Sequence, residues 1–192
     1  MRQQRIQARR LALTAIVLAA TVPSAAAQSR DHLSLQEVEL VQDAQILDKR
    51  IDVFIKAIDR RMLALTGTDA ASARQIQKDS EKWGELPKGT RAELIDDIAK
   101  ILDEAITNID DVSLHDEKNP LIPKALRKLT AEATRVHDQL LPMRAHAETE
   151  VELGNLEEAL ENTQSIIDAA NKLPPPTETR EKGKGGKSKD KP

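Results

Sequence analysis

The 192-residue chain contains no cysteine and only two aromatic residues, and its net charge is −3. The absence of cysteine excludes disulfides, thiolate nucleophiles, iron–sulfur clusters and cysteine-bound zinc. The shortage of aromatic side chains argues against β-sheets and against sites that stack sugars or nucleic-acid bases.

The first 27 residues have the order of a secretory signal peptide. Four arginines precede an uncharged aliphatic run, Leu11–Val22, and Ala25 and Ala27 supply small residues before Gln28. The run is too short for a membrane-spanning helix, which needs roughly 20 residues. We therefore expect cleavage after residue 27 and a periplasmic or secreted protein that is not an integral membrane protein. The alternative is an uncleaved anchor.

Charge is distributed unevenly along the rest of the chain. Removing the four leader arginines from the net charge of −3 leaves residues 28–192 at −7, whereas residues 177–192 carry +3. An acidic body argues against nucleic acid as a partner, because phosphate binding needs a basic face. Residues 177–192 are rich in lysine and glycine and are predicted to form a disordered tail.

The first helical signal follows a capping box, in which Ser34 and Glu37 satisfy each other's backbone amides. Apolar residues then recur at steps of three and four, which predicts one long helix over Ser34–Leu65 that Gly67 stops. Residues 68–82 are polar and form either a short helix or a mobile connection. Residues 83–89 are rich in glycine and proline and predict a loop.

The second half of the chain repeats this pattern. A capping box at Thr90 starts a helix that extends to Val112, and a third apolar stripe begins at Ile122. This stripe continues beyond Pro142, which predicts a kink there. Gly154 and Asn155 predict a tight turn, with Asn155 capping a last helix.

Four long helices joined mostly by short connections predict an all-α, antiparallel helical bundle over residues 28–176.

Six acidic residues repeat every seven residues along the second predicted helix. They would lie opposite its apolar face, either as a docking surface for a cationic partner or as an ordinary solvated face. Trp83 is the other unusual side chain, and it either contacts a partner or folds back over the end of the core. The candidate partner-contact residues are Trp83, Asp96, Asp97, Asp103, Glu104, Asp110 and Asp111.

No motif of nucleophilic, nucleotide-dependent or dinucleotide-dependent catalysis is present, so we predict neither enzymatic activity nor a cofactor. His146 and Glu150 are four residues apart and could face one metal ion, with His137 as a further candidate ligand. His137 has no glutamate three residues before it, and neither has His146, as a carboxylate-bridged di-iron bundle would require. We therefore predict no metal site.

Two segments resemble known families. Gly154–Leu160 resembles the start of a tetratricopeptide-repeat helix, which implies a helical hairpin with its turn at Gly154. Asp43–Arg61 and Glu81–Val112, which includes the run from Trp83 to Arg91, resemble an uncharacterised family of exported bacterial helical proteins. This second resemblance implies an envelope location and no known activity.

The sequence thus predicts an exported, non-enzymatic helical protein that binds a protein or a cell-envelope component, as an adaptor or scaffold does. Its exposed surface would come from the long first helix and from residues 66–89. One alternative is a structural coiled-coil protein that self-associates into a homo-oligomer. A metal-dependent enzyme is the other.

Overall fold

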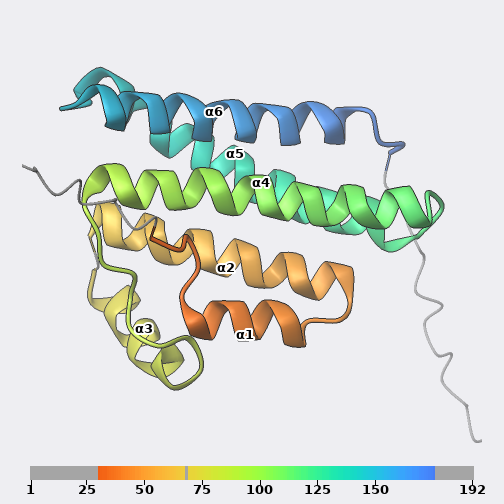
Figure 1. Cartoon of the computed structure of the whole chain (residues 1–192), viewed down its shortest axis with the longest axis horizontal. Helices are drawn as coiled ribbons and strands as arrows, with labels where there is room; N and C mark the ends of the chain where they lie inside the picture. The colour runs from red at the N-terminus through yellow and green to blue at the C-terminus, as the bar shows by residue number, and fades with distance from the viewer. Residues whose placement is uncertain (1–29, 68, 176–192) are drawn as a thin grey trace, which may run out of the picture. The chain divides into compact units, whose positions relative to one another are not determined.

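The computed structural model describes residues 30–67 and 69–175, and within these ranges it contains helices and no strand (Figure 1). The all-α fold predicted from the periodicity is confirmed. The predicted signal peptide and the predicted tail lie outside the described residues. Among the described helices, none is long and apolar enough to cross a membrane.

Four helices build the bundle: α2 (Leu47–Thr66), α4 (Arg91–His115), α5 (Leu121–Leu140) and α6 (Glu150–Asn171). Consecutive members run antiparallel. α2 packs against α4 and α5, and α6 packs against the same two helices on the other side (Figure 1). The chain therefore crosses the bundle diagonally between α4 and α5, which makes α4 and α6 parallel neighbours.

Asparagines of α6 fix the register of this parallel pair. Asn155 Nδ2 donates to the Ala92 carbonyl at 2.9 Å, and Asn162 Nδ2 donates to the Ala99 carbonyl at 3.0 Å. The second bond lies seven residues beyond the first on both helices, so α4 and α6 run in the same direction. The core between the four helices is almost wholly aliphatic, and Phe54 is its single aromatic side chain.

The prediction of a single helix over Ser34–Leu65 is wrong. The capping box at Ser34 is present, but α1 ends at Asp43 after beginning at Leu35, and the chain then turns back so that α1 lies against α2. The Arg50 Nε donates to the Ala44 carbonyl at 3.0 Å and satisfies one of the acceptors that the break leaves free. Folding back also carries Glu37 onto the arginines of α2.

The polar connection after α2 forms a helix, α3 (Ala70–Trp83), which Asp69 caps. Gly67 ends α2 with a φ of 86°, as its position predicts, because glycine adopts this conformation without steric cost. α3 lies outside the four-helix bundle (Figure 1).

Two predictions in the second half are also wrong. At Pro142 the helix does not continue with a kink. α5 ends at Leu140, a 3₁₀ helix spans Leu141–His146, and α6 begins after Thr149, whose hydroxyl accepts from the Glu152 amide at 3.1 Å. Because the cap is Thr149, Gly154 lies inside α6, and the turn and helical hairpin predicted there are absent.

Candidate functional site

Trp83 is the last residue of α3 and is only 9% exposed, so it folds back onto the bundle instead of projecting from a loop. The guanidinium carbon of Arg60 lies 5.9 Å from the centre of its ring, within the range of a cation–π contact. One side of the indole therefore rests on a buried cation. Trp83 also lines a groove.

This groove, which we call the Trp83 groove, has a volume of about 420 Å³ and lies where the end of α1, the start of α2 and the end of α3 meet. Apolar atoms of Leu40, Val53 and Trp83 line it. The break between α1 and α2 contributes directly, because Ala44 in the connection is part of the lining. The full lining is Leu40, Asp43, Ala44, Lys49, Asp52, Val53, Lys82 and Trp83.

The charged side chains of the Trp83 groove differ in their partners. Asp52 is bound by Lys128 Nζ at 2.6 Å and lies 3.8 Å from Lys49 Nζ. Asp43 and Lys82 are exposed, and neither forms a side-chain hydrogen bond or ion pair with another described residue. The groove therefore offers one free negative and one free positive charge beside an apolar lining.

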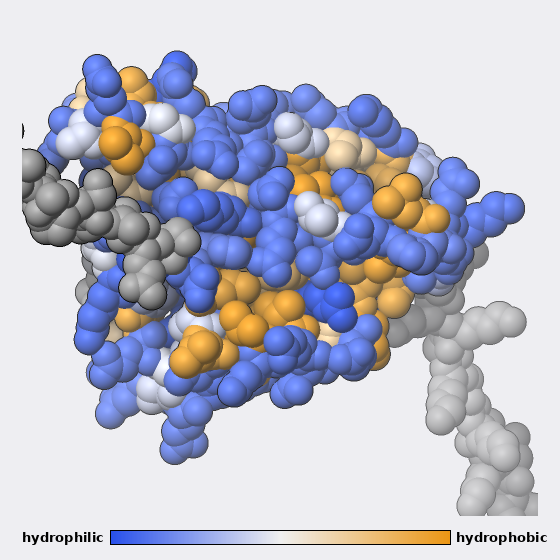
Figure 2. Space-filling model, in the orientation of Figure 1, coloured by the Kyte–Doolittle hydropathy of each residue, from blue (hydrophilic) through white to orange (hydrophobic). Residues whose placement is uncertain are grey.

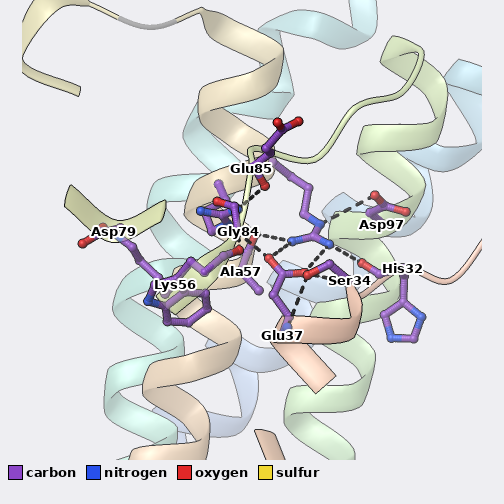
Figure 3. Close-up of polar contacts among 12 residues, drawn as sticks. His32, Ser34, Glu37, Lys56, Ala57, Asp79, Gly84, Glu85 and Asp97 are labelled. Carbon is purple, nitrogen blue, oxygen red and sulfur yellow. Dashed lines mark hydrogen bonds and ion pairs between the residues drawn. The ribbon is translucent and has the colours of Figure 1, made fainter. Parts of the chain in front are cut away.

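A buried charge network lies close to the groove and determines how its walls meet (Figure 3). Arg61 Nη1 and Nη2 each donate to one oxygen of Glu37 at 2.7 Å, a bidentate pair that joins α1 to α2. Arg61 also donates to the His32 carbonyl at 2.5 Å. Its Nε approaches Asp97 Oδ2 of α4 at 3.6 Å, an ion pair longer than a hydrogen bond.

Arg60, the preceding residue, orders the end of α3. Its Nε donates to Glu37 Oε1 at 3.3 Å, and its Nη2 donates to the carbonyls of Trp83 at 3.0 Å and Gly84 at 3.2 Å. The Glu85 carbonyl accepts from the same nitrogen. These carbonyls have no partner within α3, and a cation is favoured where a helix presents them. Arg60 therefore holds Trp83 in place from two directions.

The network is electrically balanced and removed from water. Glu37, Arg60, Arg61 and Asp97 are each at most 2% exposed, and they supply two carboxylates and two guanidinium groups. Burial opposes ionisation of Glu37, but the hydrogen bonds and charge of Arg61 outweigh it and hold the pKa of that carboxyl below its usual value. The charges of the network compensate one another, and its contacts link α1, α2, α4 and the end of α3.

The structure does not place the six acidic residues of α4 on one exposed surface. Asp97 is buried against Arg61, so its predicted surface position is wrong. Asp96 pairs with Lys100 at 2.7 Å, and Glu104 Oε2 lies 2.7 Å from His32 Nε2. The three exposed members are Asp103, Asp110 and Asp111.

The candidate metal ligands do not form a cluster. His137 lies in α5, His146 ends the 3₁₀ helix and Glu150 begins α6. Within the described ranges, no three histidine or carboxylate side chains are grouped so that they could hold a metal ion.

Sequence reasoning singled out Trp83 but missed the two arginines that hold it. A signal was available for Arg61 alone, which follows Ile58 by three residues and therefore lies at the edge of the apolar stripe. Arg60 falls on the opposite face of the helix, where periodicity predicts exposure. Comparison of the chain with protein-family models, with curated proteins and with solved structures gives no match.

Proposed function

We propose that this chain is a non-enzymatic binding protein that holds an amphipathic helix of a partner protein in the Trp83 groove. The observation that carries the proposal is the combination of an apolar lining with two unpaired charges of opposite sign. A partner helix would lay apolar side chains on Leu40, Val53 and Trp83. It would also present a basic residue to Asp43 and an acidic residue to Lys82.

The choice of a protein partner rests on this charge pattern. A groove for a wholly apolar ligand gains nothing from free charges beside its lining, whereas a helix supplies charged side chains on either side of an apolar face. A rigid site also binds at lower entropic cost than a mobile one. The Arg60 contacts to Trp83 supply that rigidity.

The test is a pull-down with the full-length tagged chain from envelope extract, read by mass spectrometry. We expect a helical protein to be recovered by the wild type and lost, or reduced at least about tenfold, with the double variant Asp43→Lys, Lys82→Glu, since each reversed charge would now repel its counterpart. Both positions are exposed, so folding should survive. The matched control is Glu161→Lys, Lys172→Glu, which exchanges charges at two exposed positions of α6 and its C-cap and likewise leaves the net charge unchanged. Equal recovery by the groove variant and the wild type would refute the site.

We further propose that the protein works outside the cytoplasm, on the strength of the signal-peptide pattern in residues 1–27. Fractionation followed by N-terminal sequencing tests this. A mature chain that begins at Gln28 in the periplasmic or secreted fraction would support export, and a full-length chain confined to the cytoplasm would contradict it.

A second candidate function is self-association, and the exposed apolar residues at the two ends of α1 favour it. Leu35 is 80% exposed, and Ile46, just beyond α1, is 54% exposed. Figure 2 shows apolar surface on the face of the molecule where α1 lies. The partner would be a second copy of this chain. Sedimentation equilibrium of the purified chain distinguishes self-association from the binding of another protein. A dimer that Leu35→Lys abolishes would favour self-association.

A further inference from the structure

α3 is attached to the rest of the molecule mainly at one end. No side chain of α3 belongs to the aliphatic core or to the partly buried apolar residues packed against it. The one buried residue of α3 is Trp83, at its last position. Since apolar burial is what makes a helix resist local opening, the body of α3 should be held weakly and its last turn strongly.

The interface between α2 and α3 is loosely packed. A surface pocket of about 90 Å³ lies between the two helices beside Ile76, and a wider open cleft of about 500 Å³ lies between α3, Ala64 of α2 and residues 84–88. Ile76 lines both spaces. Because open space flanks Ile76, this side chain has few packing partners, and the interface gains little from dispersion contacts.

One ion pair ties the middle of α3 to α2. Lys56 Nζ lies 2.8 Å from Asp79 Oδ2, and both side chains are partly exposed. Water and salt screen such a pair, so it stabilises the closed arrangement only modestly.

The two ends of α3 differ in their backbone constraints. Gly67, which precedes α3, has a φ of 86° and no atom within 4 Å of where a Cβ would stand. Gly84, which follows α3, also has a positive φ, but Arg60 holds its carbonyl and those of Trp83 and Glu85. The chain can therefore change its dihedral angles before α3 at low cost while the other end stays fixed.

We propose that the body of α3 opens as one local unit: residues 70–79 leave α2 and lose their helical hydrogen bonds together, while the last turn stays fixed at Trp83. The opening uncovers apolar surface at Leu63, Ala64 and Ile76. This motion leaves the four-helix bundle intact. It is independent of the proposed binding function, because Lys82, Trp83 and the groove that they line belong to the last turn of α3, which stays in place.

Hydrogen–deuterium exchange on the full chain tests the proposal, read for the amides of α3 and of α4. In the wild type we expect the α3 amides to exchange at least about 100-fold faster than those of α4, since a local opening exposes them without global unfolding. Lys56→Ala should speed exchange in α3 several-fold further and leave α4 unchanged. The matched control is Lys100→Ala, which breaks an ion pair within α4 and should not alter the α3 rates.

Fluorescence separates opening of residues 70–79 from detachment of the whole helix, because Trp83 at the end of α3 is the only tryptophan. We expect its emission maximum to be the same in the wild type and in Lys56→Ala. The proposal fails if α3 is as protected as α4, if Lys56→Ala leaves the α3 rates unchanged, or if that variant shifts the emission to that of exposed indole.

Discussion

At the scale of single residues, Arg60 and Arg61 are adjacent in sequence and act in different directions. Arg61 compensates Glu37 and approaches Asp97, so it joins α1, α2 and α4. Arg60 binds the carbonyls that follow α3. Arg60 thereby attaches α3 and the turn at Gly84, neither of which contributes to the aliphatic core.

The first prediction concerns Glu37. We expect Glu37→Ala to lower the free energy of unfolding by about 3–5 kcal/mol, because it leaves the buried Arg61 charge without its bidentate partner. Urea denaturation followed by circular dichroism measures this. Glu85→Gln is the control: it removes an exposed pair with Lys88 and should leave the midpoint nearly unchanged. Equal effects of the two variants would contradict the role given to the network.

The sequence predicted part of this arrangement. The capping box at Ser34 follows from local spacing alone, and the structure contains it. The second role of Glu37, as partner of two arginines 23 and 24 residues away, depends on α1 folding back. No local rule contains that information. Asp97 was misplaced for the same reason, since the position of Arg61 in α2 does not tell which residue of α4 it faces.

At the scale of elements, the apolar stripes located the helices but not all of their ends. Leu40, Ala44, Leu47 and Ile51 continue one stripe, yet the helix breaks between Ala44 and Leu47. A stripe with steps of three and four is satisfied equally by one straight helix or by two helices that fold against each other. The choice is made by tertiary contacts, here those of Glu37 and Arg50.

Glycine gives a direct test of two element boundaries. Gly154→Ala should raise the free energy of unfolding by about 0.5–1 kcal/mol, because Gly154 lies exposed inside α6 with no atom within 4 Å of the added Cβ. Gly67→Ala should lower it by about 1 kcal/mol or more, because alanine is strained at a φ of 86°. Thermal unfolding by calorimetry measures both, and a destabilising Gly154→Ala would restore the turn predicted from the sequence.

At the scale of the whole molecule, the short connection between α4 and α5 crosses the bundle diagonally, and α6 then returns beside α4. Helix lengths and short loops predict an all-α bundle with consecutive helices antiparallel, and that is what forms. They do not predict which helices become neighbours. Polar contacts between distant segments determine which helices are neighbours. The ion pairs of Lys128 with Asp52 and of Arg135 with Asp59, for example, join α5 to α2.

The candidate site, like the fold, was only partly predictable from the sequence. Trp83 could be selected from the sequence because it is the only tryptophan. The Trp83 groove could not be, since its lining comes from three helices and from the break that the periodicity concealed. A site composed of contacts between elements becomes visible only once the elements are placed.

The pH dependence of folding tests the charge network in the intact molecule. Contacts with Arg61 hold the pKa of Glu37 below its ordinary value of 4.5, so the unfolded chain binds this proton more tightly. The stability that Glu37 contributes is therefore complete above its unfolded-state pKa and is lost as the pH falls through the folded-state pKa. Lys124 lowers the pKa of Asp48 and Lys56 lowers that of Asp79, and both act in the same direction.

Glu132 should act in the opposite direction. Burial, with a smaller contribution from Asp59, raises its pKa despite Arg135, so the folded protein gains stability as the pH falls through that pKa. We expect urea midpoints measured from pH 7 to pH 3 to fall less in Glu37→Gln than in the wild type, and more in Glu132→Gln. If the midpoints of both variants fall in parallel with that of the wild type, protonation of neither carboxyl is coupled to folding. The loss of stability in acid would then come from exposed carboxyl groups.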